Sequence, residues 1–180
     1  MSSFLRASAA LLLLSACATA GAPAKAPPVV ETVAPRPEDV GSVDGVLKAF
    51  YEVTNIAPGA PRQWARDRTL YVPWIHFVSI HDGKDGPEVT SWTHPEFVAA
   101  TEPLLKAGFQ ERELKRRVSR YGNIAHVESS YETRSGTDNP KVSRGVNFLE
   151  LFFDGTRWWV ASAVWQGESP RTPIPSELLP

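Results

Sequence analysis

Hydrophobic residues between positions 43 and 54 recur at the spacing of one face of an amphipathic helix. The repeating positions are Val43, Val46, Leu47, Phe50, Tyr51 and Thr54. Ser42 is suited to the N-cap of this helix. A second, shorter helix is predicted from Pro61 through Tyr71, with Pro61 in its first turn. A third follows from Phe97 to Leu105, after Thr93 and Glu96, which are spaced as a capping box.

The remaining hydrophobic pattern is typical of β-strands. The segments Trp74 to Ile80 and Glu88 to Trp92 predict a strand pair around Asp-Gly turns. From Phe109 onward, a long hairpin is predicted around Gly122-Asn123. Its expected register places Val118 opposite Val127 and Leu114 opposite Tyr131, with Arg117 opposite Glu128 on the other face.

Two further strands complete the predicted sheet. The segment from Val142 to Phe153 is almost continuously apolar from Val146, which predicts a central strand covered on both faces. The last strand, Arg157 to Gln166, is predicted to alternate regularly. One face then carries Trp158, Val160, Ser162 and Val164, and the other carries Trp159, Ala161, Ala163 and Trp165.

The first residues have the layout of a secretory signal peptide, with Arg6 before a short apolar run. The sequence Leu-Ser-Ala-Cys at positions 14–17 resembles the bacterial lipobox, which implies a signal peptide over 1–16 and a lipid-modified Cys17. The alternative is an ordinary signal peptide cut near Ala16. Residues 17–38 are rich in Ala and Pro and predict a disordered tether. The resemblance implies a cell-envelope protein held in a membrane through Cys17; Ala18 after it implies the outer membrane, facing the periplasm.

Length and charge restrict the remaining possibilities. The chain has 180 residues, which favours one folded domain, here residues 39–180. Lys plus Arg number 19 and Asp plus Glu number 20, so no nucleic-acid partner is expected. One cysteine permits neither an intrachain disulfide nor a cysteine-based zinc site.

The element order and two segments resemble the nuclear transport factor 2-like superfamily, which includes ketosteroid isomerases and SnoaL-like polyketide cyclases. The similar segments are Tyr121-Gly122-Asn123-Ile124-Ala125-His126-Val127 and Asp154-Gly155-Thr156-Arg157-Trp158-Trp159-Val160-Ala161-Ser162. The resemblance covers residues 42 to 166. It implies an α+β cone-shaped barrel, in which a curved antiparallel sheet of about six strands wraps around three helices. It also implies a pocket at the wide end and a homodimer through the sheet's outer face.

Candidate chemistry is sparse. The catalytic candidates are His126, Tyr131 and Asn147, and the expected pocket-lining residues are Tyr51, Trp74, Asn147, Ser162 and Val164. Val127 is expected to face the core, so its neighbour His126 is expected on the outer face of the sheet. An ion pair on that face is therefore the favoured interpretation of His126. His76, His81, Asp82 and Asp85 match no metal-binding spacing, so no metal and no cofactor are expected. No Asp is predicted to point inward from the strands.

Two hypotheses follow. The first is a membrane-tethered domain whose pocket binds a small apolar ligand or a partner protein without catalysis. The second is an envelope enzyme of the isomerase, cyclase or hydrolase kind that uses a pocket His or Tyr. A homodimer is also predicted through the face expected to carry Trp159, Trp165 and His126, because an exposed apolar patch usually marks an interface.

Overall fold

The computed structural model describes residues 29–105, 107–136 and 139–180. The predicted signal peptide and Cys17 lie outside these residues. Four helices and six strands appear in chain order, followed by a short 3-10 helix. The helices are α1 (Pro37–Val40), α2 (Val43–Thr54), α3 (Trp64–Arg68) and α4 (His94–Leu105). The strands are β1 (His76–Asp82), β2 (Pro87–Thr93), β3 (Phe109–Tyr121), β4 (Ile124–Ser135), β5 (Lys141–Phe153) and β6 (Trp158–Gly167).

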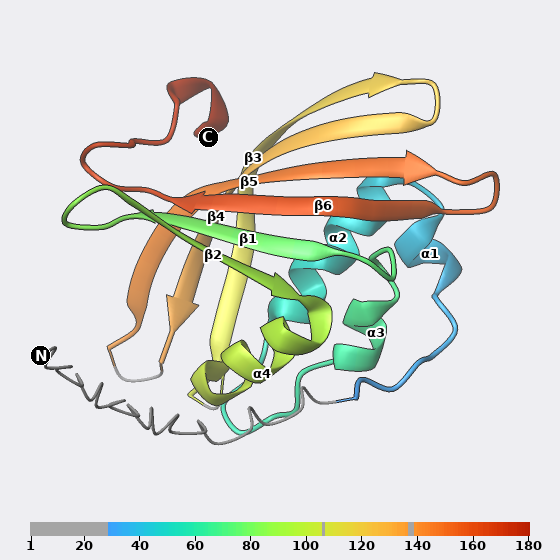
Figure 1. The fold of residues 1–180 in the computed structure, drawn as a ribbon, viewed down its shortest axis with the longest axis horizontal. Coiled ribbons are helices and arrows are strands. Elements are labelled where there is room, and N and C mark those ends of the chain that lie inside the picture. The colour runs from blue at the N-terminus through green and yellow to red at the C-terminus, as the bar shows by residue number, and fades with distance from the viewer. Residues whose placement is uncertain (1–28, 106, 137–138) are drawn as a thin grey trace, which may run out of the picture.

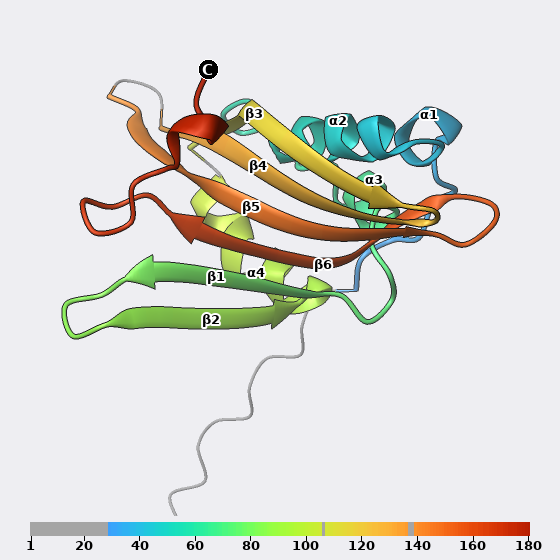
Figure 2. The same cartoon turned by 90° about the horizontal axis from the view of Figure 1, so that it is seen from above.

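The six strands form one strongly curved sheet in the order β2-β1-β6-β5-β4-β3, with the helices on its concave side (Figures 1 and 2). The predicted α+β cone is confirmed. The sheet is mixed rather than wholly antiparallel, because β1 runs parallel to β6. In the described part of the chain, no helix has the length and apolar character that a membrane crossing requires.

The helical predictions hold where capping and periodicity agree. The Ser42 hydroxyl accepts a hydrogen bond from the Gly45 N–H at 3.0 Å, as expected of an N-cap. The Thr93 N–H and hydroxyl both donate to Glu96, at 2.8 and 2.7 Å. The second helix is shorter than predicted, because Tyr71 leaves it and forms a bridge with Val160 of β6.

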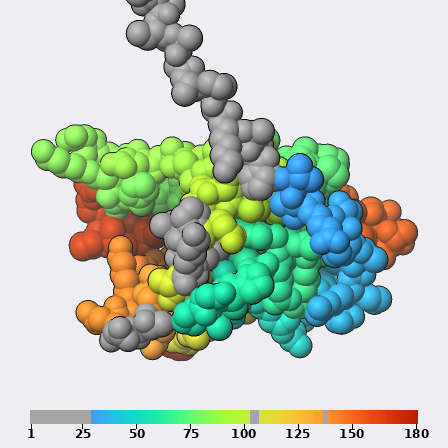
Figure 3. All heavy atoms as spheres, turned by 90° about the horizontal axis from the view of Figure 1, so that it is seen from below, coloured from blue at the N-terminus to red at the C-terminus, as the bar shows by residue number. Residues whose placement is uncertain are grey.

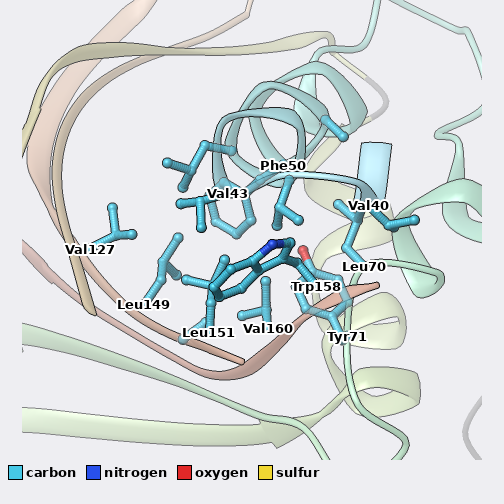
Figure 4. Packing of buried hydrophobic residues seen from close by; sticks show 14 of the residues in the cluster. Val40, Val43, Phe50, Leu70, Tyr71, Val127, Leu149, Leu151, Trp158 and Val160 are labelled. Atoms are coloured by element: carbon cyan, nitrogen blue, oxygen red, sulfur yellow. The ribbon is translucent and has the colours of Figure 1, made fainter. Parts of the chain in front are cut away.

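The core lies between α2 and the concave face of the central strands. Figure 4 shows Phe50 and Val43 of α2 above Leu149 and Leu151 of β5, with the Trp158 ring between the layers. Trp158 is 3% exposed. The outer face of β5 is not covered as predicted, since Phe148 is 48% exposed. The sheet curves around a single helical layer, which covers its inner face and leaves Phe148 on the outer face half-exposed.

A β-bulge in β3 changes the predicted hairpin register. Val118 lies opposite Val127 and Arg117 opposite Glu128, as predicted. Beyond them the register shifts, so that Glu113 rather than Leu114 lies opposite Tyr131. An extra residue in one strand reverses the faces of all the residues beyond it. Glu111 therefore lies opposite Thr133, with its side chain on the inner face.

A second bulge, at Ala161 in β6, makes the predicted alternation of the last strand wrong. Leu151 pairs with Val160, whereas Glu150 pairs with Ser162. Trp158 and Val160 face the core as predicted, but beyond the bulge Ala163 and Trp165 face inward. Trp165 therefore does not share an outer patch with Trp159.

The C-terminal segment packs on the outer face of the sheet (Figure 2). Ile174 and Leu178 are buried there. The Ser130 hydroxyl donates to the Leu178 carbonyl at 2.5 Å, and the Lys115 amine donates to the Leu179 carbonyl at 2.9 Å. This segment narrows the outer face that is free to contact another molecule.

Candidate functional site

A cavity of about 550 Å³ lies on the concave side of the sheet, where β4 ends and β5 begins. This volume falls within the range of small-molecule sites, about 300–1,000 Å³. Seven aromatic residues line it: Phe50, Tyr71, Phe77, Phe97, Phe109, Tyr131 and Trp165. In Figure 3, which views this side of the molecule, α1 to α4 lie across the face in blue to yellow-green, beside the orange β4–β5 end.

The aromatic wall is built by elements far apart in the sequence. Phe77 of β1 packs against Phe97 of α4 with ring centres 4.7 Å apart, and Trp165 of β6 lies 6.1 Å from Phe97. Trp92 of β2 stacks on Trp165, with ring centres 6.2 Å apart. Packed rings of this kind give a rigid, apolar surface. The wall therefore suits a flat, apolar group.

Glu111 is the one carboxylate among the cavity-lining residues that the structure describes. Desolvation by the surrounding protein raises its pKa to about 7, although the Asn147 amide and the Arg62 guanidinium stabilise its ionised form. A carboxyl group that titrates near neutral pH can accept or donate a proton under physiological conditions. Sequence reasoning missed Glu111, because the register without a bulge turns it outward.

Asn147 connects the cavity to a chain of hydrogen bonds. Its side-chain N–H donates to the Tyr51 hydroxyl at 3.2 Å. The Tyr51 hydroxyl lies 2.6 Å from the Ser129 hydroxyl, which donates to Glu113 at 2.6 Å. Burial raises the pKa of Tyr51, so its hydroxyl stays protonated. This chain holds the Asn147 amide in one orientation in the cavity wall.

A buried charged cluster that no sequence pattern predicted lies next to the cavity. His94 Nε2 lies 2.7 Å from Asp67 Oδ2, and the Tyr71 hydroxyl donates to Asp67 Oδ1 at 3.3 Å. Arg62 Nη2 also donates to Asp67 Oδ1 at 3.3 Å. Of these residues, Arg62 and Tyr71 line the cavity itself. The helices that carry Asp67 and His94 appear ordinary and amphipathic in the sequence.

The structure brings together only some of the predicted site residues. Tyr131 and Asn147 line the cavity, and Tyr51 contacts it through Asn147. Trp74 is 67% exposed and lies outside it. Val164 lies in a groove under the C-terminal segment, and Ser162 pairs with the exposed Glu150 on the outer face. The Ala161 bulge is the cause of both displacements.

His126 lies on the outer face of the sheet, away from the cavity. Its Nδ1 is 2.6 Å from Glu150, and its Nε2 is 3.8 Å from Glu128. His76 and His81 are exposed on β1, and His81 pairs with Glu88 at 2.9 Å. The described residues contain no group of three or more His, Cys, Asp or Glu side chains placed to hold a metal ion.

Solved structures share this fold at low sequence identity. The beta subunit assigned to an aromatic-ring-hydroxylating dioxygenase of Novosphingobium aromaticivorans aligns with a TM-score of 0.56 and 13% identity, covering 74% of this chain and 95% of that one. A protein of the nuclear transport factor 2-like family from Streptomyces avermitilis, assigned as a dehydratase, gives 0.54 and 18%, covering 73% and 96%. A protein from Exiguobacterium sibiricum, assigned as a calcium/calmodulin-dependent kinase II association domain, gives 0.53 and 10%, covering 71% and 92%.

The chain therefore has the nuclear transport factor 2-like fold, as the sequence resemblance implied. No family model and no curated protein matches the chain. The three similar structures carry different functional assignments, and a shared fold does not transfer chemistry. The function must be argued from the cavity.

Proposed function

We propose that this protein binds a small, largely apolar ligand in the concave cavity of its domain. The observation that carries the proposal is the cavity itself, about 550 Å³ with seven aromatic lining residues and a few polar groups. Pockets of this size and composition are typical of small-molecule binding. Binding requires no chemistry from the wall, and the catalytic candidate His126 lies outside it, in the outer-face ion pair that the sequence favoured.

Blocking the cavity tests this proposal. Gly167 lines the cavity, and a Cβ added there would meet no atom within 4 Å. Gly167→Phe should therefore fold and fill the space. Native mass spectrometry of the purified wild type should show a co-purified ligand mass that Gly167→Phe lacks. Ser119→Phe, on the exposed far end of β3, is the matched control and should retain the ligand. Equal retention by Gly167→Phe would contradict a ligand in this cavity.

A second candidate function, an isomerase, cyclase or hydrolase, is favoured by one observation. Glu111 lies in the cavity wall with its pKa raised to about 7 by desolvation, which suits a general base. This residue replaces the predicted His or Tyr as the proton acceptor. In deuterated water, the co-purified ligand should then exchange a C–H proton with wild type and not with Glu111→Gln. A ligand recovered without exchange or conversion would exclude proton abstraction by Glu111.

We also propose that the domain is tethered to a bacterial membrane by lipid on Cys17, in the outer membrane facing the periplasm. The lipobox-like sequence at 14–17 and the Ala/Pro-rich stretch after it support this. Two or more lipid chains give stable anchoring. Cys17→Ala should move the protein to the soluble fraction or leave an uncleaved precursor. Unchanged membrane retention and mass would contradict lipid anchoring.

The homodimer through the outer sheet face also stays a proposal, with Phe148 in place of Trp165 as its expected centre. Phe148 is exposed on β5, and Val146 and Val164 lie near it in the same groove. Phe148→Glu should give a folded monomer by light scattering, because a charge in a desolvated interface is costly. Val89→Glu on the edge strand β2 is the control. A wild-type protein that is already monomeric would contradict the dimer.

A further inference from the structure

Arg62 is a buried cation with unused hydrogen-bonding capacity. Its side chain is 4% exposed and lines the cavity. A guanidinium has five N–H donors. In the described residues, one side-chain bond is present, from Nη2 to Asp67 at 3.3 Å, and the buried Nε has no partner. Burying a charged donor without a partner costs free energy, so such a group is expected to meet an acceptor.

Asp67 compensates the Arg62 charge only in part. The distance of 3.3 Å is longer than the 2.7–2.9 Å of a strong charge-assisted hydrogen bond. The carboxylate of Asp67 also lies 2.7 Å from His94 and accepts from Tyr71. The Arg62 guanidinium instead stacks on the Trp64 ring, 4.1 Å from its centre. This stacking fixes the plane of the guanidinium while leaving donors available.

Two further basic residues line the cavity. Lys141 and Arg144 line its mouth, and Arg144 pairs with Glu168 at 2.8 Å. Glu111 is the one acidic lining residue in the described chain. An anionic group that approaches the exposed Lys141 is attracted by its charge, and Arg62 lies among the same lining residues. The cationic Arg62 and the aromatic wall therefore line the same cavity.

We propose that the ligand is a small aromatic monocarboxylate, with its carboxylate paired to Arg62 and its ring against Phe77, Phe97 and Trp165. This rests on the proposed binding function and names its ligand class. The planar guanidinium matches a carboxylate in two-point geometry. Phe97 joins the two parts of the site, because its ring lies 5.7 Å from the Arg62 guanidinium and 4.7 Å from Phe77.

Calorimetric titration with trans-cinnamate and its neutral analogue cinnamamide tests the ligand class at constant pH. Wild type is expected to bind cinnamate at least tenfold more tightly. Arg62→Gln should lose this preference while still binding cinnamamide. Arg171→Gln removes an exposed guanidinium outside the cavity and should keep the preference. Arg62→Lys keeps the charge without the planar fork and should retain part of it.

A second measurement uses wild type alone, in case Arg62→Gln does not fold. In ¹⁵N-labelled protein, the Arg62 Nε–H signal should move on adding cinnamate and stay in place with cinnamamide, because only cinnamate gives the guanidinium a carboxylate partner. Equal affinity for the two probes, or an unmoved Nε–H signal, would overturn the carboxylate assignment while leaving ligand binding intact. If neither probe binds and no ligand co-purifies, the proposed function itself fails.

Discussion

Replacing Glu111 by Gln should change how the stability of this protein depends on pH. The folded protein raises the pKa of Glu111 from 4.5 to about 7. Between these values, the folded state holds a proton that the unfolded state has released. The protonated carboxyl therefore contributes to the free energy of unfolding. This contribution is fully present below pH 4.5 and is lost as the pH rises through about 7. A difference of about 2.5 units, at about 1.4 kcal/mol per unit, corresponds to about 3 kcal/mol.

Gln resembles the protonated carboxyl in shape and does not titrate. Glu111→Gln should therefore unfold with about 3 kcal/mol more free energy than wild type at pH 8, and the two should converge toward pH 4.5. Urea titrations followed by tryptophan fluorescence at several pH values measure this difference. Glu31→Gln, at an exposed position before α1, should follow wild type throughout. A difference between Glu111→Gln and wild type that does not change with pH would show that folding does not raise the pKa of Glu111.

Four further substitutions test the core, the cavity wall, the sheet and the buried cluster. Trp158→Ala should lower the free energy of unfolding by about 3–5 kcal/mol, because this ring fills the core, whereas Trp165→Ala should cost less and enlarge the cavity; denaturant titration compares them. Gly145→Ala should cost about 1–3 kcal/mol in thermal unfolding, since the added Cβ overlaps the Gln166 carbonyl oxygen. Asp67→Ala should cost about 3–5 kcal/mol by urea titration, because it leaves a buried guanidinium unpaired. A loss below about 1 kcal/mol for Trp158→Ala, Gly145→Ala or Asp67→Ala would contradict the expected role of that residue.

The elements of the fold could be predicted from the sequence because local patterns specify them. The helical spacing from Val43 to Thr54, the Ser42 cap and the Gly122-Asn123 turn each match the structure. The hairpin register near that turn was also correct, since a short turn fixes the pairing of the residues beside it. Element order then sufficed to suggest the cone-shaped fold.

The cavity was decided by two β-bulges that have no local signature. Regular alternation turns Glu111 and Trp165 outward, and the register shifts at Leu114 and Ala161 turn both inward. Neither position carries the Gly that marks one common class of bulge, so nothing in the pattern identifies the extra residue. A bulge forms where a strongly curved sheet must bend around its helices, which is a property of the closed structure.

The sequence alone was enough to predict α2, α4, the strands, the tight hairpin and the outer-face position of His126, because these depend on residues near one another in the chain. The tertiary structure was needed to bring Arg62, Asp67 and His94 together, since Asp67 and His94 are 27 residues apart in the chain. It was also needed to place Arg62 and Glu111 in one cavity. The physical reason is that charged residues are normally solvated, and only the packing of α3 and α4 against the curved sheet removes the water around them.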